Sequence, residues 1–232
     1  IKRLDKNAAS IAPAEKGAEN EALQLGNAFY ESRAAFKKEG FLRPVIVGFG
    51  PAGMFAAWYL SRLGLRPLVI ERGDRVEERK KRVEELMEKG ILDTESNIQF
   101  GEGGAGTFSD GKLTTGIKNP LCALVLELFN RFGAPDEILY QQRPHIGTDI
   151  LHGVVKNMRR EVERLGGEIC FRAKLCDIHY ENSRFVGISY TENDEIKEVR
   201  SDRLILAAGH SARDLLQMLY KKGVKMLAKP FS

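Results

Sequence analysis

Short, continuously apolar runs alternate with segments of helical period along the chain from about residue 44 onward. Val45–Val47 and Pro67–Ile70 are runs of this kind, and each is typical of a strand that is buried on both faces. Between them, Pro51 occupies a first-turn position and apolar residues recur until Gly64, which predicts a helix. The pattern therefore predicts a strand, a helix and a second buried strand in immediate succession.

Three segments after the second strand have the period of amphipathic helices. They run from about Val76 to Lys89, from Asn119 to Gly133, and from Thr148 to Gly166. Within the first of them, Glu77–Arg82 mixes charges of both signs and places acids four residues before bases. This spacing indicates a solvated helix face rather than a binding patch.

Alternating strand patterns follow between residues 169 and 199, interrupted by turn-forming residues at 181–183 and 192–194. We predict a small antiparallel meander from four short segments: Ile169–Phe171, Leu175–Tyr180, Phe185–Tyr190 and Ile196–Val199. The last buried strand is Leu204–Ala207. Ser211, with Asp214 three residues later, predicts a capped helix that continues to Gly223.

Charge and cysteine usage exclude several classes of partner. The net charge of +4 is interspersed along the chain, so nucleic acid is not an expected partner. Cys122, Cys170 and Cys176 lack the spacing of a zinc site or a disulfide framework, and no metal is expected. No apolar run approaches the ~18 residues of a membrane span. We therefore expect a cytoplasmic protein that makes no use of a membrane.

The chain divides into a weakly patterned beginning and one long domain. Residues 1–40 are polar and Ala-rich, with one weakly amphipathic stretch from Leu23 to Phe36, and are predicted to be an extension or linker. Residues 41–232 carry all the stronger patterns and are predicted to form a single domain. Because the first residue is Ile1 rather than Met, we expect a piece of a longer protein.

A glycine motif stands between the first predicted strand and the first predicted helix. Gly48, Gly50 and Gly53 form G-x-G-x-x-G in the segment VIVGFGPAG. Gly48 permits a tight turn, Gly50 lets the backbone approach a pyrophosphate, and Gly53 lets the helix pack closely on the strand. The helix N-terminus would then attract the anion. The motif, placed between these elements, predicts the ADP-binding βαβ unit of a dinucleotide-binding protein.

Glu71, at the end of the second strand, is placed to accept hydrogen bonds from a ribose diol. A carboxylate would repel a 2′-phosphate, which disfavours NADP at this site and leaves NAD and FAD. The fingerprint cannot separate these two. A doubly wound dehydrogenase would continue with alternating buried strands and helices, whereas this chain continues with a Gly-rich stretch, two helices and a meander. The order of elements favours FAD.

Five segments resemble a family of FAD-dependent dehydrogenases that belongs to the glutathione-reductase-like flavoproteins with two dinucleotide-binding folds. The segments are RPVIVGFGPAG from Arg43, ERG from Glu71, SNIQFGEGGAGTFSDGKL from Ser96, HIGTD from His145 and LAAGHSARD from Leu206. The resemblance implies an α/β, Rossmann-like FAD/NAD(P)-binding fold. In this fold a parallel sheet has helices on one side and an antiparallel β-meander on the other.

The resemblance also implies which residues hold each part of FAD. Those expected to contact it outside the Gly-rich segment are Gly48, Gly50, Pro51, Ala52 and Gly53 at the pyrophosphate, Glu71 at the adenosine ribose, Arg72 at the adenosine edge, Leu175 at adenine through its backbone, and Ala208 and Gly209 at the pyrophosphate from below. For Ala208 and Gly209, a simple strand-to-helix turn is the alternative interpretation.

The Gly-rich segment is interpreted as a loop that faces the flavin. Its glycines leave backbone N–H groups available to a ligand, and its apolar residues could anchor it, although a flexible surface loop is the alternative. The residues assigned to the flavin in this segment are Gly103, Gly104, Ala105, Gly106, Thr107 and Lys112. Lys112 would stabilise the reduced, anionic flavin, and the alternative for this residue is simple solvation.

We therefore expect an FAD-dependent oxidoreductase in which the flavin accepts electrons or hydride at N5, with NAD(P)H as a candidate electron donor. No catalytic residue is identified, the substrate or electron acceptor is unknown, and the four histidines are expected to be structural. Two alternatives stay open: a flavin-binding domain with a structural or RNA-modification role, and a plain NAD-binding module. Family members continue past the KPF segment into a substrate-covering region, so truncation before that region is expected.

Overall fold

The computed structural model describes residues 41–228 apart from residues 110 and 118. The predicted linker at residues 1–40 lies outside the described residues. A four-stranded parallel sheet forms the centre of the fold, in the order β3-β2-β1-β7. Its strands are β1 (Val45–Val47), β2 (Leu68–Ile70), β3 (Glu168–Cys170) and β7 (Leu204–Leu206). The predicted βαβ unit is confirmed, with β1 and β2 joined by α2 (Pro51–Arg62).

The position of β3 corrects one prediction. Ile169–Phe171 was expected in the antiparallel meander, but this segment belongs to the parallel sheet, where Ile169 pairs with Val69 of β2. The helix α5 (Thr148–Arg164) precedes β3 and crosses the sheet, so the chain returns parallel to β2. The short apolar run alone did not indicate which sheet it would join.

The remaining three strands form the predicted meander. They are β4 (Ala173–Glu181), β5 (Arg184–Glu192) and β6 (Glu195–Arg200), paired antiparallel in sequence order. Each hairpin has a two-residue turn, and both residues of each turn, Asn182-Ser183 and Asn193-Asp194, have positive φ. Such turns match the twist of the flanking strands, and Asn and Asp tolerate this conformation well.

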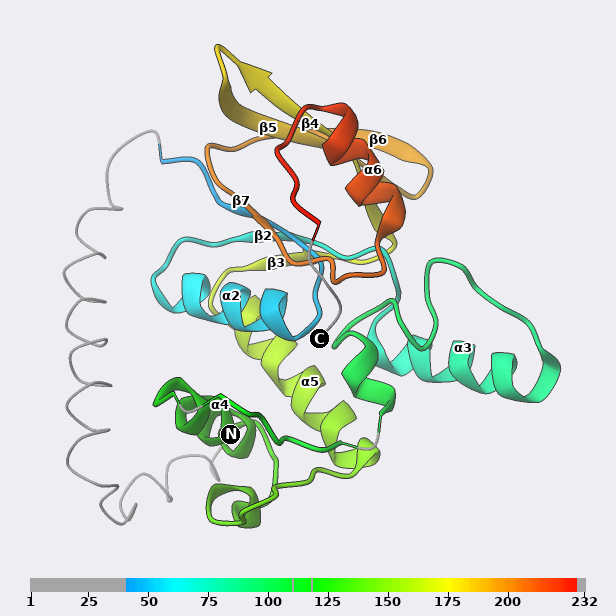
Figure 1. Ribbon diagram of the computed structural model, residues 1–232, viewed down its shortest axis with the longest axis vertical. Coiled ribbons are helices and arrows are strands. Elements are labelled where there is room, and N and C mark those ends of the chain that lie inside the picture. Colours follow the sequence, from blue (N-terminus) through cyan, green and yellow to red (C-terminus); the bar gives the residue numbers. More distant parts are fainter. Residues whose placement is uncertain (1–40, 110, 118, 229–232) are drawn as a thin grey trace.

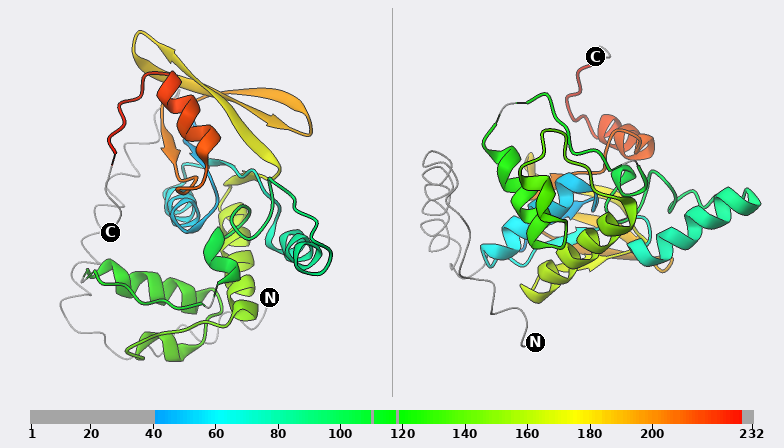
Figure 2. Two further views of the ribbon diagram at one scale, coloured as in Figure 1. Left: turned by 45° about the vertical axis from the view of Figure 1, so that its right-hand side comes forward. Right: turned by 90° about the horizontal axis from the view of Figure 1, so that it is seen from below.

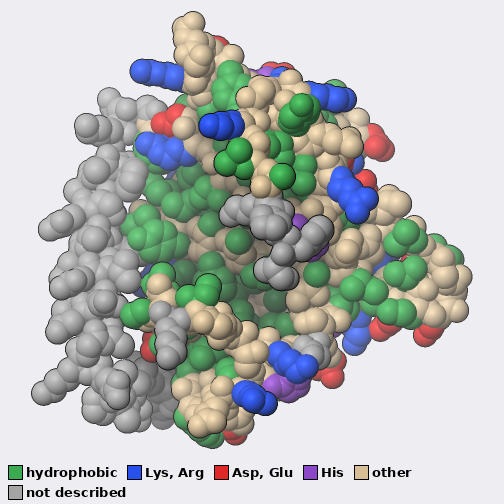
Figure 3. Space-filling view, in the orientation of Figure 1, with side chains coloured by type: hydrophobic (Ala, Val, Ile, Leu, Met, Phe, Trp, Pro, Cys, Tyr) green, Lys and Arg blue, Asp and Glu red, His purple; other side chains and the backbone are tan. Residues whose placement is uncertain are grey.

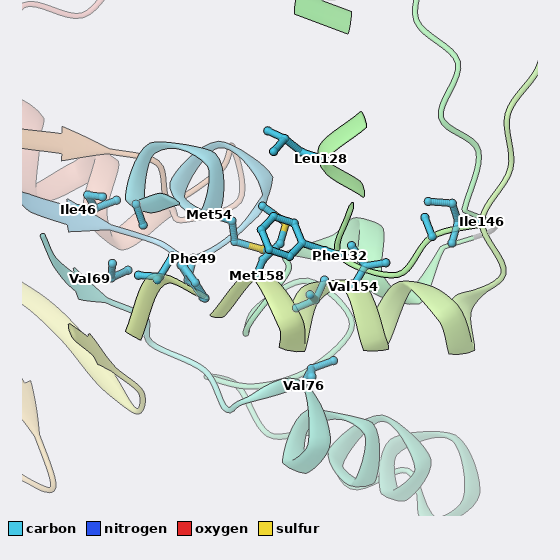
Figure 4. Close-up of a cluster of buried hydrophobic side chains, with 14 of the residues drawn as sticks. Ile46, Phe49, Met54, Val69, Val76, Leu128, Phe132, Ile146, Val154 and Met158 are labelled. Carbon is cyan, nitrogen blue, oxygen red and sulfur yellow. The ribbon is translucent and has the colours of Figure 1, made fainter. Parts of the chain in front are cut away.

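The parallel sheet separates two hydrophobic cores, as the fold class predicts. On one face, α2 and α5 cover Ile46 and Val69 (Figures 1 and 4). On the other face, Val45 and Val47 pack with residues of the meander and of α6 (Arg213–Lys221). Neighbouring residues of β1 therefore point to opposite cores, which explains why this strand is apolar throughout.

The segment between β2 and β3 contributes helices around the edge of the sheet. They are α3 (Val76–Lys89), the 3-10 helix η1 (Ala105–Phe108), α4 (Leu121–Arg131) and the 3-10 helix η2 (Asp136–Leu139). In Figure 2, α3 projects from the side of the molecule, while α4 and η2 lie at the end opposite the antiparallel sheet. Buried side chains of α4 extend the core beneath α5.

Two local predictions are wrong. The helix α6 begins after Ala212, and neither Ser211 nor Asp214 caps it; the Asp214 carboxylate binds Arg72 and Lys174 instead. The face of α3 at Glu77–Arg82 is not entirely solvated, because Arg79 has an exposed fraction of 0%. In both cases a tertiary ion pair or hydrogen bond uses a side chain that the local pattern assigned to the helix surface.

Candidate cofactor-binding site

A cavity of about 750 Å³ lies at the carboxyl ends of β1, β2 and β7. Ligands of open α/β sheets bind at this edge of the strands. The lining includes many of the residues predicted to bind a dinucleotide: Gly48, Gly50, Pro51, Ala52, Glu71, Arg72, Gly104, Ala105, Leu175, Ala208 and Gly209. The fold thus brings together segments that are far apart in the sequence. Hydrophobic side chains gather in the hollowed middle of the face in Figure 3.

Glycine is needed at the three motif positions for different physical reasons. Gly48 has a φ of +98°, and a Cβ there would lie 2.5 Å from the carbonyl oxygen of Ala207. A Cβ on Gly53 would collide with the carbonyl oxygen of Gly48. At Gly50, by contrast, the nearest atom to an added Cβ is 3.7 Å away, on Gly104, and φ is negative. The protein itself requires glycine at 48 and 53, whereas a Cβ on Gly50 would make only an ordinary contact with Gly104, and Gly50 lines the cavity.

The N-terminus of α2 opens into this cavity. Gly50 is the N-cap, it provides no side-chain cap, and the first turn has no acidic residue. Pro51 has no N–H, and the first backbone hydrogen bond of the helix is donated by Met54 to Gly50. The N–H groups of Ala52 and Gly53 precede that bond, so they remain available to an anion together with the positive end of the helix dipole.

Glu71 lies where a carboxylate that binds the ribose was predicted. It directly follows β2, lines the cavity and has an exposed fraction of 4%. Its two carboxylate oxygens accept backbone hydrogen bonds from Phe49 N–H at 2.7 Å and from Gly73 N–H at 2.9 Å. These donors fix the carboxylate, and each oxygen keeps a further lone pair that can accept from a ribose hydroxyl.

A cluster of four charged side chains borders the cavity beside Glu71. Arg72 makes ion pairs with Glu95 at 2.7 Å and Asp214 at 2.9 Å, and Lys174 makes ion pairs with the same two acids. The guanidinium of Arg72 also lies 4.6 Å from the centre of the Phe100 ring. Despite the opposing effect of burial, hydrogen bonds from Lys174 and Arg72 hold the pKa of Asp214 well below its ordinary value. The cluster fixes Arg72 at the edge of the cavity.

Part of the predicted set lies outside the lining. Gly53 supports the turn from behind, and Gly103 donates its N–H to Phe49. Gly106 and Thr107 belong to η1, which borders the cavity through Ala105. Lys112 is exposed, and its backbone forms an isolated antiparallel bridge with His145. Contact of these residues with a cofactor stays a prediction.

Comparisons with known proteins agree with this geometry. Residues 42–228 match the family described as pyridine nucleotide-disulphide oxidoreductase. The chain belongs to this family. The match confirms the predicted oxidoreductase family, and the similarity to solved structures agrees with the predicted Rossmann-like fold.

An uncharacterized protein of Clostridium beijerinckii is 51% identical over 190 residues, which are 82% of this chain and 35% of that protein. The chain thus spans about a third of the relative's length. Among solved structures, Thermovibrio ammonificans THI4 is similar with a TM-score of 0.50 and 16% identity, over 92% of this chain and 73% of that chain. Glycerol-3-phosphate dehydrogenase from Bacillus halodurans, solved with FAD, gives a TM-score of 0.49 and 13% identity, over 82% and 38%.

Several lining residues of this oxidoreductase domain escaped the sequence analysis. They are mostly on the Gly-rich loop, β4 and α6: Gln99, Phe100, Lys174, Cys176, His210, Ser211, Asp214, Leu215 and Met218. The position of Lys174 and Cys176 beside Leu175 could have suggested two of them. The lining residues of α6 could have been suggested by Asp214, which lies in the first turn of a helix that follows the end of a strand.

The larger omission is a buried network beneath the Gly-rich loop. Glu102 has an exposed fraction of 0%, accepts a hydrogen bond from Val76 N–H at 2.7 Å and pairs with Arg159 at 2.8 Å. Arg159 also pairs with Glu77 at 2.8 Å. The sequence of α3 contained a signal that one of its faces is buried: Arg79 lies on the same face of the helix as the apolar residues Val76 and Val83.

Within the residues that the structure describes, no group of three or more His, Cys, Asp or Glu side chains could hold a metal ion. No described helix is both long and apolar enough to cross a membrane.

The two kinds of glycine predict different variants. Gly53→Ala should lower the melting temperature of the apoprotein strongly, because its Cβ has no space against Gly48. Gly50→Ala should melt close to the wild type but lose most of its FAD affinity, because its Cβ enters the cavity. Thermal melts without FAD and FAD titrations measure the two effects. A Gly50→Ala protein with unchanged affinity would remove Gly50 from the site.

Burial raises the pKa of Glu102 from 4.5 to about 7, although Arg159 and the Val76 N–H oppose this shift. Between these values the folded protein keeps a proton that the unfolded chain has lost, so the free energy of unfolding should fall as pH rises. Burial lowers the pKa of His152, which gives the opposite slope.

The comparison with Glu102→Gln isolates the contribution of Glu102. Relative to the wild type, this variant should gain free energy of unfolding steadily between about pH 5 and 7. Urea denaturation at several pH values measures the difference. A difference that is constant over this range would show that Glu102 is not protonated in the folded protein.

Proposed function

We propose that this cavity binds FAD and that the chain is the FAD-binding portion of an oxidoreductase. The observation that carries the proposal is that Gly50 lines the cavity at the uncapped N-terminus of α2, together with Glu71, although an added Cβ there would meet no close contact within the protein. Packing within the protein does not require glycine there, whereas a pyrophosphate that rests on the backbone does. The residues present therefore fit a dinucleotide.

Each part of the site is assigned by its chemistry. The pyrophosphate is assigned to the N-terminus of α2, where the N–H group of Ala52 is available at the cavity, and to Ala208 and Gly209, which line the cavity without bulky side chains. Glu71 accepts hydrogen bonds from the adenosine ribose. The remaining assignments, at the adenosine edge and at adenine, are Arg72 and the backbone of Leu175.

The chain's own residues bind, orient and shield the cofactor, and FAD supplies the redox chemistry. The Gly-rich loop closes one side of the cavity through Phe100, Gly101 and Gly104. Leu215 and Met218 of α6 also border the cavity. Apolar walls of this kind exclude water from a bound cofactor.

We further propose a pyridine nucleotide as the electron donor and a cytoplasmic location. The family description supports the donor, and the free thiols of Cys122, Cys170 and Cys176 support a reducing compartment. Nucleic acid and membranes are not proposed as partners. No substrate is proposed, because the fold alone does not identify it.

The donor is tested by mixing FAD-loaded protein with NADH or NADPH in the absence of oxygen. Loss of the flavin absorbance is the expected result, because the flavin accepts the hydride. A flavin that neither nucleotide reduces, but that dithionite does, would contradict a pyridine nucleotide as donor. That result would favour the structural or RNA-modification role.

Glu71→Ala should weaken FAD binding by about 1.5 to 3 kcal/mol, or roughly ten- to 150-fold in Kd, because charge-assisted hydrogen bonds to the ribose are lost. Glu78→Ala is the matched control, since Glu78 is exposed on α3. Titration of the apoprotein with FAD measures both, at a temperature where melts show that both are folded. Equal affinities for the two variants would exclude Glu71 from the ribose site.

A further inference from the structure

Arg79 is a buried cation on a helix that is otherwise largely solvated. Its guanidinium donates hydrogen bonds to backbone carbonyl oxygens of a single segment, residues 97–104. The acceptors are Asn97 at 2.8 Å, Ile98 at 2.8 Å, Glu102 at 2.7 Å, Gly104 at 2.7 Å and Gly101 at 3.4 Å. One side chain thus binds five carbonyl oxygens in the first part of the Gly-rich loop.

The loop is shaped around this side chain. A Cβ on Gly101, which has a φ of +118°, would lie 2.5 Å from the Cδ atom of Arg79. The guanidinium also lies 4.7 Å from the centre of the Phe108 ring. The other surface of the loop, at Phe100 and Gly104, lines the cavity. The position of Arg79 therefore decides how far the loop extends into the cofactor site.

Arg79 also balances the charge of two buried acids. Burial lowers its pKa to about 10, while the carboxylates of Glu71 and Glu102 act in the opposite direction. It consequently stays protonated at neutral pH. Glu71 is the proposed ribose ligand and lines the cavity, whereas Glu102 belongs to the Gly-rich loop and is fully buried.

We propose that Arg79 is a positioning residue of the FAD site: its hydrogen bonds hold the Gly-rich loop in its binding shape, and Arg79 itself does not touch FAD. This inference rests on the proposed binding of FAD in the cavity. It assigns Arg79 a role in affinity that is separate from any role in folding.

The test uses Arg79→Lys and Arg79→Met, with Arg82→Met as the control. Arg82 lies one turn further along α3, is largely exposed, and pairs with Asp74, Glu85 and Asp93, none of which lines the cavity. Lysine keeps the charge but cannot reproduce the planar set of donors, so it separates charge from geometry.

Each variant is melted without FAD and then titrated with FAD, and the visible circular dichroism of the bound flavin is recorded. Arg79→Met should raise the Kd for FAD by about tenfold or more. Arg79→Lys should recover part of the melting temperature but not the wild-type Kd or flavin spectrum. Arg82→Met should match the wild type in Kd and spectrum.

Lower melting temperatures with unchanged Kd and flavin spectrum in both Arg79 variants would overturn the proposal, because Arg79 would then serve stability alone. Failure of both variants to fold would overturn it too, since the residue would be a requirement of the fold. A wild-type chain that binds no FAD would instead refute the proposed function, and this is seen before any variant is compared.

Discussion

The turn between β1 and α2 has no room for a side chain at Gly48 or Gly53, and the position of the cofactor site follows from this fit. The carbonyl oxygen of Ala207 approaches Gly48 from β7, so the turn is confined by the neighbouring strand as well as by its own helix. The N-terminus of α2 is therefore held against the carboxyl ends of three parallel strands. An anion at that place interacts with unpaired N–H groups whose direction is set before it arrives.

The Gly-rich loop packs against this turn and is held in place by different interactions. Among its described residues, the Gly-rich loop contains the short η1 as its one helical element. Buried charges hold the loop: Arg79 binds its carbonyl oxygens, and Glu102 ties it to α3 and α5. Such groups are costly to bury unless every one is paired. A loop fixed in this way can present backbone to a ligand without a hydrophobic core of its own.

The elements that could be predicted from the sequence are those governed by local pattern. The runs Val45–Val47 and Leu68–Ile70, the turn glycines and the hairpin turns at Asn182 and Asn193 follow from periodicity and backbone preference. The sheet to which β3 belongs could not be predicted, because three apolar residues fit either sheet. That assignment depends on where α5 returns the chain.

The candidate site shows the same division. Motif residues such as Gly50 and Glu71 were predicted because a dinucleotide imposes a fixed spacing on the first βαβ unit. Arg79 was assigned to a solvated face because charged residues surround it along α3. Arg79 is buried because the Gly-rich loop, about 20 residues further along the chain, folds back over it. The ion pairs of Asp214 with Arg72 and Lys174 likewise join distant segments, so the local pattern led to its interpretation as part of a helix cap.

Hydrogen exchange of the backbone amides, measured with and without FAD, tests the central claim most directly. If FAD lies across the strand ends, in the cavity lined by the α2 turn and the Gly-rich loop, exchange should slow in residues 48–54, 99–106 and 207–211. Exchange should stay unchanged in α4, at residues 121–131, which is remote from the cavity lining. Saturating FAD that slows exchange in none of the three segments, or chiefly in α4, would contradict the account.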